Sequence, residues 1–374
     1  MNATEILDRL VSFPSVVGTA NGDIVAWVRA YLQDLSVTVT VLPGPEGDRS
    51  NLFASIGPKD VPGYILSGHM DVVPAEASEW QSPPFRLRRD GAALYGRGTT
   101  DMKGFLAAAL AAVPKLVAAG LKRPIHLAFS YDEEAGCRGV PHMIAKLPEL
   151  SAPPLGAIIG EPSGMRAVLA HKGKAAARVT LGGRAGHSSR PDLGLNAIHA
   201  MAEVLNAAID QAAALQQGPF DAAFAPPWSS LQAGVISGGK AVNIIPDLAV
   251  LELEARAVSG TDPKALLEPV RRRAEALREK GIQVDWQVLS AYPPLALSAD
   301  APLAHLVAGL SGEAPIGAVS YGTEAGLYQA AGVDALICGP GDIGRAHKPD
   351  EFILESELFA CQSFIEALGQ RCAA

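Results

Sequence analysis

Short apolar runs alternate with helical patterns through the first half of this chain. Three strand-like runs and three helical segments follow one another at about residues 22–35, 64–66, 102–119, 125–129, 138–147 and 157–159. Parallel strands need long crossover connections, usually helices, and their burial on both faces makes them read as continuous apolar runs. The alternation therefore predicts an α/β fold with a mixed, largely parallel sheet flanked by helices.

The pattern changes after Gly173 and returns near residue 290. The intervening segments are a strand at 174–181, a helix at about 194–217, strands at 231–236 and 249–256, a helix near 263–280 and a strand at 282–286. This strand, helix, strand, strand, helix, strand order is ferredoxin-like. We expect a catalytic domain in two parts, 1–173 and 290–374, interrupted by an inserted α+β domain over 174–289.

Bulk properties exclude several classes of protein. A formal net charge of -8 argues against a nucleic-acid binder, which would carry a basic face. The longest apolar run, residues 105–113, is far shorter than the roughly 20 residues of a membrane span. The N-terminus lacks a signal-peptide pattern, and the four cysteines form no C-x-x-C pair. We therefore expect a cytoplasmic protein without nucleic-acid or membrane partners.

Seven side chains of the types that bind metals or transfer protons follow predicted strands or open a helix. They are His69, Asp71, Asp101, Glu133, Glu134, Glu161 and His347. Taken singly, each has an ordinary explanation as a helix cap, a solvated turn or a core histidine. The carboxyl ends of parallel strands meet at one edge of a sheet, however, so these residues are expected to converge. Their convergence favours a metal-dependent catalytic site.

The charges of this set suit a pair of divalent ions. Asp101, Glu134 and Glu161 supply about three negative charges, and His69 and His347 are neutral ligands. Two divalent ions and one bridging hydroxide balance this sum. Mixed histidine and carboxylate ligands are typical of zinc, and cobalt or manganese can substitute.

The two remaining carboxylates have supporting roles in this interpretation. Asp71 lies two residues after His69 and is expected to accept the second ring N–H of that histidine. Glu133 is expected to be the general base, which takes a proton from water and returns it to the leaving amine. The predicted reaction is hydrolysis of an amide.

Four motifs resemble the two-zinc aminoacylase and carboxypeptidase family. They are residues 67–74 (SGHMDVVP), 95–104 (YGRGTTDMKG), 132–134 (DEE) and 160–162 (GEP). The resemblance implies that His69, Asp101 and Glu161 bind one Zn²⁺, and that Asp101, Glu134 and His347 bind the second. It also implies Glu133 as the base and a cis peptide bond after Asp101.

The same resemblance extends to the inserted domain. His187 lies in a Gly-His-Ser segment whose histidine stabilises the oxyanion in the family and can come from a partner subunit. Asn243 and Arg256 are similar to residues of the lid that hold a substrate carboxylate, for which the planar fork of arginine is well suited. The resemblance implies a homodimer formed through the inserted domain.

Residues 321–325 and 338–351 are similar to the acetylornithine deacetylase type within the family. Thr323 and Glu324 are candidate substrate-binding residues, because Glu324 could pair with the ammonium of ornithine; the alternative is a charge at a helix N-terminus. The implied reaction converts N2-acetyl-L-ornithine and water to L-ornithine and acetate, in arginine biosynthesis. Alternatives are another N-acyl-amino-acid deacylase, a succinyl-diaminopimelate desuccinylase, or a dipeptidase or carboxypeptidase.

Two other classes of function have weaker support. Gly339, Gly341 and Gly344 match G-x-G-x-x-G, which would indicate an NAD-dependent oxidoreductase, but Pro349 follows soon after and no βαβ unit remains. We expect these glycines instead to allow the turn that directs His347 back toward the site. A non-catalytic binding relative would lack a ligand or the base, whereas every position is filled here.

Overall fold

The computed structural model describes residues 1–374 and divides them into two compact units. The first unit comprises residues 1–170, 297–318 and 323–374, and the second comprises 171–296 and 319–322. The chain therefore leaves the first unit after its seventh strand and returns to it for the last quarter of the sequence.

The first unit is built on a six-stranded sheet in the order β1-β2-β6-β3-β7-β16. The strands are β1 (Thr38–Pro43), β2 (Ser50–Ile56), β3 (Tyr64–His69), β6 (Ile125–Ser130), β7 (Gly156–Pro162) and β16 (Ala335–Gly339). β1, β2 and β6 pair antiparallel, and β6, β3, β7 and β16 run parallel. All residues of β6, β7 and β16 are buried, as strands covered on both faces must be. The predicted mixed, largely parallel sheet is confirmed.

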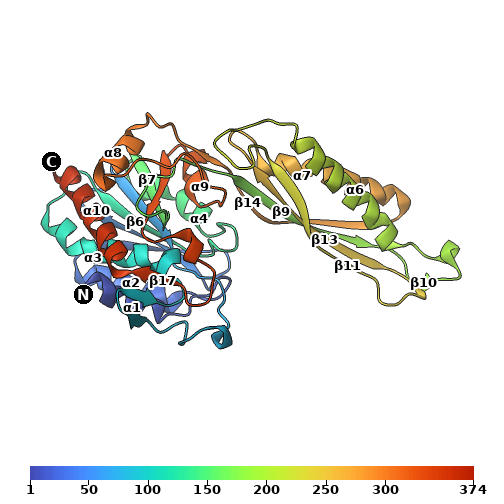
Figure 1. Cartoon of the computed structure of the whole chain (residues 1–374), viewed down its shortest axis with the longest axis horizontal. Helices are drawn as coiled ribbons and strands as arrows, with labels where there is room; N and C mark the ends of the chain where they lie inside the picture. The colour runs from blue at the N-terminus through green and yellow to red at the C-terminus, as the bar shows by residue number, and fades with distance from the viewer. The chain divides into compact units, whose positions relative to one another are not determined.

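Helices flank this sheet. They are α1 (Ala3–Val11), α2 (Gly22–Asp34), α3 (Gly104–Ala118), α4 (Val140–Ile144), α5 (Leu147–Leu150), α8 (Pro302–Ser311), α9 (Ala325–Ala330) and α10 (Glu355–Ala373). α1, α3 and α10 pack against one another, as Figure 1 shows, and α4 packs against α9. A small sheet of β4 (Arg88–Asp90), β5 (Ala93–Tyr95) and β17 (Phe352–Leu354) joins the C-terminal segment to the region before α3.

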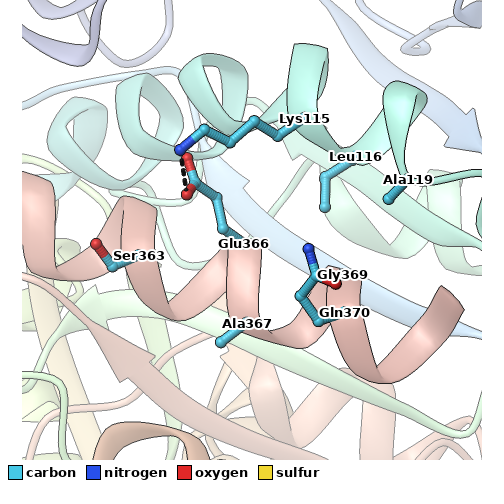
Figure 2. Close-up of a pocket in the computed structure, with 8 residues that line it drawn as sticks. All are labelled: Lys115, Leu116, Ala119, Ser363, Glu366, Ala367, Gly369 and Gln370. Atoms are coloured by element: carbon cyan, nitrogen blue, oxygen red, sulfur yellow. Dashed lines mark hydrogen bonds and ion pairs between the residues drawn. The ribbon is translucent and has the colours of Figure 1, made fainter. Parts of the chain in front are cut away.

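Helix α3 is buried because its sequence is apolar on every side. Residues 104–113 are all buried, which is typical of a helix inside a core. The helix begins at Gly104, two residues later than predicted, because Asp101 and Met102 have non-helical backbone angles and the peptide between them is cis. The expected cis bond is thus confirmed. Toward its C-terminal end, α3 and α10 border a cavity of about 330 Å³ beside the ion pair of Lys115 and Glu366 (Figure 2).

The second unit has a four-stranded antiparallel sheet in the order β11-β13-β9-β14. Its elements are β9 (Gly173–Gly182), α6 (Ala197–Leu215), β11 (Ser230–Gly238), β13 (Leu248–Ala257), α7 (Pro263–Ala276) and β14 (Gln283–Tyr292). Both helices lie on one face of this sheet (Figure 1). Buried and less buried residues alternate along β9 and β13, because only one face of the sheet packs on the helices.

Side-chain caps set where the two helices of the second unit begin. The Asn196 side chain accepts hydrogen bonds from the backbone N–H groups of Ile198 and His199, so α6 starts at Ala197 and not near Gly194 as predicted. The Asp262 side chain caps α7 in the same way. Across both units, no helix combines the length and the apolar character needed to cross a membrane.

Candidate metal centre

In the first unit, the predicted residues lie near the ends of parallel strands, at one edge of the sheet. His69 ends β3, Glu133 and Glu134 follow β6, and Glu161 lies near the end of β7. His347 comes eight residues after β16 and has a positive φ of 60°. Asp101 enters from the turn that precedes α3. The structure therefore brings all five predicted metal ligands, and the predicted base, into one region.

Asp101 lies between the two histidines, with one carboxylate oxygen toward each. Its Oδ1 is 3.0 Å from His69 Nε2, and its Oδ2 is 3.2 Å from His347 Nε2. His69 Nε2 is also 3.6 Å from a carboxylate oxygen of Glu161, and His347 Nε2 is 3.0 Å from Glu134. Two groups of potential ligands thus share one aspartate, which is the arrangement expected of a bridging ligand.

The donor set fits divalent metal ions. The ligand atoms of His69, Asp101 and Glu134 lie within 4.8 Å of one another, and so do those of His69, Glu133 and Glu161. His69, Asp101 and Glu161 are at most 6% exposed, whereas His347 is half-exposed at its ring. Buried carboxylates need a compensating charge, and mixed nitrogen and oxygen donors match zinc and its neighbours.

The pKa shifts in this cluster follow from burial and from the charges of neighbouring groups. Burial and the charge of Asp101 raise the pKa of Glu161 well above its usual value. Burial, opposed in part by His69 and reinforced by Glu134, raises the pKa of Glu133 to about 8. Hydrogen bonds with the carboxylates of Asp101 and Glu134 raise the pKa of His347 to about 10. A bound cation would relieve this repulsion among the carboxylates.

Asp71 contacts His69 through a different group from the one predicted. The Nδ1 of His69 lies 2.8 Å from the backbone carbonyl oxygen of Asp71 and 3.6 Å from its carboxylate. The carboxylate instead accepts the backbone N–H groups of Glu133 and Glu134, at 3.1 and 3.2 Å. Two convergent N–H donors hold the carboxylate, so the carbonyl takes the histidine. Nδ1 then carries the proton, and Nε2 is free to bind a metal.

Glu133 has a neighbour that sequence reasoning missed. The Cys137 thiol donates a hydrogen bond to Glu133 Oε1 at 3.3 Å, and Cys137 is buried with a φ of 57°. The spacing of four residues in the sequence was the available signal. It could not be interpreted alone, because it depends on the turn formed by residues 133–137.

Thr323 and Glu324 are buried in the first unit, each about 1% exposed. Thr323 Oγ1 accepts the backbone N–H of Ala325 at 3.1 Å. The Glu324 carboxylate accepts a hydrogen bond from Ser67 Oγ at 3.2 Å, and burial raises its pKa to about 7. Glu324 makes no capping hydrogen bond at the start of α9. The substrate-binding roles of both residues stay predictions.

The other three predicted residues belong to the second unit. Residues 186–187 (β10) pair with 244–245 (β12), which places His187 next to the segment of Asn243, and both side chains are exposed. Arg256 lies near the other end of β13, where it pairs with Glu254 at 2.7 Å. Leu248, the first residue of β13, and Arg256 are eight residues apart, which corresponds to about 26 Å along the strand, and Asn243 precedes Leu248 by five residues. One copy of this unit therefore does not bring Asn243 and Arg256 together.

Known proteins resemble this chain over nearly its whole length. Residues 65–371 match the profile of peptidase family M20/M25/M40. An acetylornithine deacetylase of Photorhabdus laumondii is 31% identical over 97% of this chain and 95% of its own length. The Pasteurella multocida protein of the same name is 33% identical, over 94% of this chain and 92% of its own.

Solved structures show the same fold. An M20 family metallo-carboxypeptidase of Sulfolobus solfataricus has a TM-score of 0.81 at 18% identity and covers 100% of this chain and 99% of its own. A dinuclear metal-binding peptidase of the M20 family from Bacillus subtilis has a TM-score of 0.65 at 15% identity, covering 99% of this chain and 98% of its own.

Proposed function

This chain belongs to peptidase family M20/M25/M40 and is a metal-dependent hydrolase, and we propose that it converts N2-acetyl-L-ornithine and water to L-ornithine and acetate. The observation that carries the hydrolytic part is the carboxylate of Asp101, which turns one oxygen toward each histidine. The substrate is supported by relatives of 31–33% identity that are named acetylornithine deacetylase.

We infer that two Zn²⁺ ions occupy the centre, with Co²⁺ or Mn²⁺ as possible substitutes. His69, Asp101 and Glu161 would hold one ion, and Asp101, Glu134 and His347 the other. Such ions polarise an amide carbonyl and lower the pKa of water. The contact of His69 Nδ1 with the backbone carbonyl of Asp71 leaves Nε2, which faces Asp101, as the nitrogen that would bind metal.

Glu133 is the proton carrier in this proposal. As the C–O bond forms, its carboxylate takes a proton from the attacking water. It then gives the proton to the amine nitrogen as the C–N bond breaks. Burial raises the pKa of Glu133 to about 8 in the metal-free chain, and bound cations would lower it again, which would leave the carboxylate able to accept a proton near pH 7. Asp71 holds the backbone of Glu133 and Glu134, and the Cys137 thiol orients the Glu133 side chain.

The second unit would supply His187 to stabilise the oxyanion, and Asn243 and Arg256 to bind the substrate carboxylate. Because Asn243 and Arg256 lie near opposite ends of β13, we propose that two copies of the chain each contribute one of them. A homodimer formed through this unit follows from that division. Strand β11 is an edge strand with exposed residues over 232–238, which suits such an interface.

The alternatives are other hydrolases that cleave an amide by the same chemistry: a different N-acyl-amino-acid deacylase, a succinyl-diaminopimelate desuccinylase, or a dipeptidase or carboxypeptidase. A comparison of kcat/KM with Zn²⁺-loaded protein separates them. The panel is N2-acetyl-L-ornithine, N-acetyl-L-norvaline, N-succinyl-L,L-diaminopimelate and a dipeptide. We expect the highest value for acetylornithine. A higher value for the succinylated substrate or the dipeptide would refute the assigned substrate.

N-acetyl-L-norvaline differs from acetylornithine only by the missing side-chain ammonium, so it isolates the role of Glu324. If Glu324 binds that ammonium, the wild-type chain prefers acetylornithine over the norvaline compound, and Glu324→Gln reduces that preference. An unchanged preference in the variant removes Glu324 from substrate binding.

The proposed reaction would provide ornithine for arginine biosynthesis, and the four free, buried cysteines fit a reducing cytoplasm.

A further inference from the structure

Glu351 is a buried carboxylate with four hydrogen-bond donors around it. It is 1% exposed and lies four residues after His347. One oxygen accepts the backbone N–H groups of Thr100 and Asp101, at 2.8 and 3.1 Å. The other accepts the N–H of Gly98 at 2.9 Å and Arg97 Nη1 at 2.7 Å. The carboxylate therefore holds the turn that carries the shared aspartate.

Arg97 extends this contact to two further loops. It is 3% exposed, and its guanidinium lies 5.0 Å from the centre of the Trp80 ring. Besides Glu351, its Nη1 donates to the carbonyl oxygen of Lys348, and its Nη2 donates to that of Pro74, each at 3.4 Å. Pro74 lies in the loop that follows His69, and Lys348 is the residue after His347.

The backbone supports the same connection. Gly96 N–H donates to the carbonyl oxygen of Glu351 at 2.9 Å, and β17 pairs with β5 immediately beside it. Thr100 Oγ1 donates to the carbonyl oxygen of Phe352 at 2.6 Å. The C-terminal segment is thus attached to residues 96–100 at the backbone of Glu351 and of Phe352. A buried ion pair is costly to desolvate, so its main contribution here is to geometry.

We propose that Arg97 and Glu351 form a positioning pair for the two-metal centre. The pair fixes the backbone of Asp101 from behind while the side chain of Asp101 faces both histidines. It also ties that turn to the loops that carry His69 and His347. This inference rests on the proposed metal centre, because the pair acts only through the ligands. Both residues are buried, at 3% and 1% exposed, and act through the backbone that carries the ligands, so both are positioning residues.

The test is Glu351→Gln in the full chain. An amide has one acceptor and one donor end, so its NH₂ must face one of the two pairs of donors. We expect Zn²⁺ affinity to fall about 10–100-fold, the range typical when a residue supporting metal ligands is lost. Competition with a chromogenic chelator measures that affinity. We also expect kcat to fall while KM for acetylornithine changes little.

Glu366→Gln is the matched control. Glu366 lies on α10 and pairs with Lys115 at 2.6 Å at the surface of the first unit (Figure 2). This variant removes the same charge from an ion pair that contacts no metal ligand, and its Zn²⁺ affinity should equal that of the wild type. Wild-type Zn²⁺ affinity and turnover in Glu351→Gln would overturn the proposal. So would a Glu351→Gln chain that melts earlier yet binds Zn²⁺ normally when folded.

Arg97→Lys tests the proposed positioning pair if Glu351→Gln does not fold. Lysine keeps the charge beside Glu351 but cannot reach Pro74 and Lys348 at the same time. We expect about tenfold weaker Zn²⁺ binding in this variant, and an unchanged affinity would overturn the proposal. An incorrect assignment of the metal centre would be recognised by a different result. In that case the wild-type chain would bind no Zn²⁺ pair, whatever the variants do.

Discussion

Asp101 shows how much function depends on the placement of a single side chain. Its two oxygens lie 3.0 and 3.2 Å from two different histidines, and its backbone N–H is held by Glu351. The residue is thereby fixed at three points before any ion binds. Rigid placement of ligands lowers the cost of ordering them when metal arrives.

The convergence of the candidate ligands was predictable from sequence because each follows a strand or opens a helix. The supporting contacts were not. Whether Asp71 bonds His69 through its carboxylate or its carbonyl depends on where the N–H groups of Glu133 and Glu134 point. The direction of those N–H groups cannot be predicted from the sequence. Glu351 lies within residues 338–351, which resemble the deacetylase type, yet its four donors come from a turn 250 to 254 residues away in the chain.

Glu133→Gln tests the proton carrier. The amide cannot accept a proton from water, so kcat should fall about 10²–10⁴-fold, while Zn²⁺ binding persists because the metal ligands remain. Steady-state rates and metal stoichiometry measure both effects. Glu149→Gln, at an exposed ion pair with Lys146, is the control and should leave kcat unchanged. Near-normal turnover in Glu133→Gln would exclude its assigned role.

Stability of the metal-free chain should fall as pH rises from about 7 to 9. Burial raises the pKa of Glu133 to about 8 and that of Glu161 well above normal, and hydrogen bonds to carboxylates raise that of His347 to about 10. The folded chain therefore keeps protons that the unfolded chain releases. Burial of Lys103, whose pKa falls to about 7, opposes this with one group.

Zn²⁺ displaces those protons, so its stabilising effect should grow over the same pH range. Melting temperatures in chelator and in Zn²⁺, compared at both ends of the range, test the two statements together. A metal-free chain whose melting temperature rises from pH 7 to 9 would contradict the assigned shifts.

At the scale of elements, the ends of β7 and β16 approach each other more closely than side chains allow. A Cβ on Gly339 would lie 1.9 Å from the carbonyl oxygen of Gly160, the residue before Glu161. The apolar runs 157–159 and 335–338 indicate both strands. The sequence could not predict this contact, because the spacing of neighbouring strands depends on the packed sheet.

Gly339→Ala should therefore force these strands apart. We expect the free energy of unfolding to fall by about 1–3 kcal/mol, as for other overpacked sites, and Zn²⁺ binding to weaken because Glu161 moves. Gly309→Ala, on an exposed position of α8 with no neighbour within 4 Å, should instead be neutral or stabilising by about 0.5–1 kcal/mol. Urea unfolding distinguishes them, and equal stabilities would contradict the expected clash.

At the scale of the whole molecule, the order of elements in the second unit followed directly from the sequence. Its alternating strands and its two capped helices are local patterns. Local sequence patterns do not indicate which copy of the chain supplies each substrate-binding residue. The positions of Asn243 and Arg256 near opposite ends of β13 are what lead to the proposal of shared sites.

Mixing two inactive variants tests that sharing. If His187 acts on the site of its partner, a mixture of Glu133→Gln and His187→Ala chains forms heterodimers with one intact site. Random exchange of subunits would then restore about a quarter of wild-type activity. Each variant alone is the control. A mixture no more active than its components, under conditions in which subunits exchange, would place His187 and Glu133 in the same chain's site.

The central claim is that this chain hydrolyses an amide at a buried pair of metal ions, and removal of metal tests it most directly. A chelator-treated chain should lose hydrolysis of N2-acetyl-L-ornithine, and Zn²⁺ should restore it, with two ions bound per chain at saturation. A metal-free chain that hydrolyses acetylornithine as fast as the Zn²⁺-loaded form would contradict the account, as would saturation with fewer than two ions.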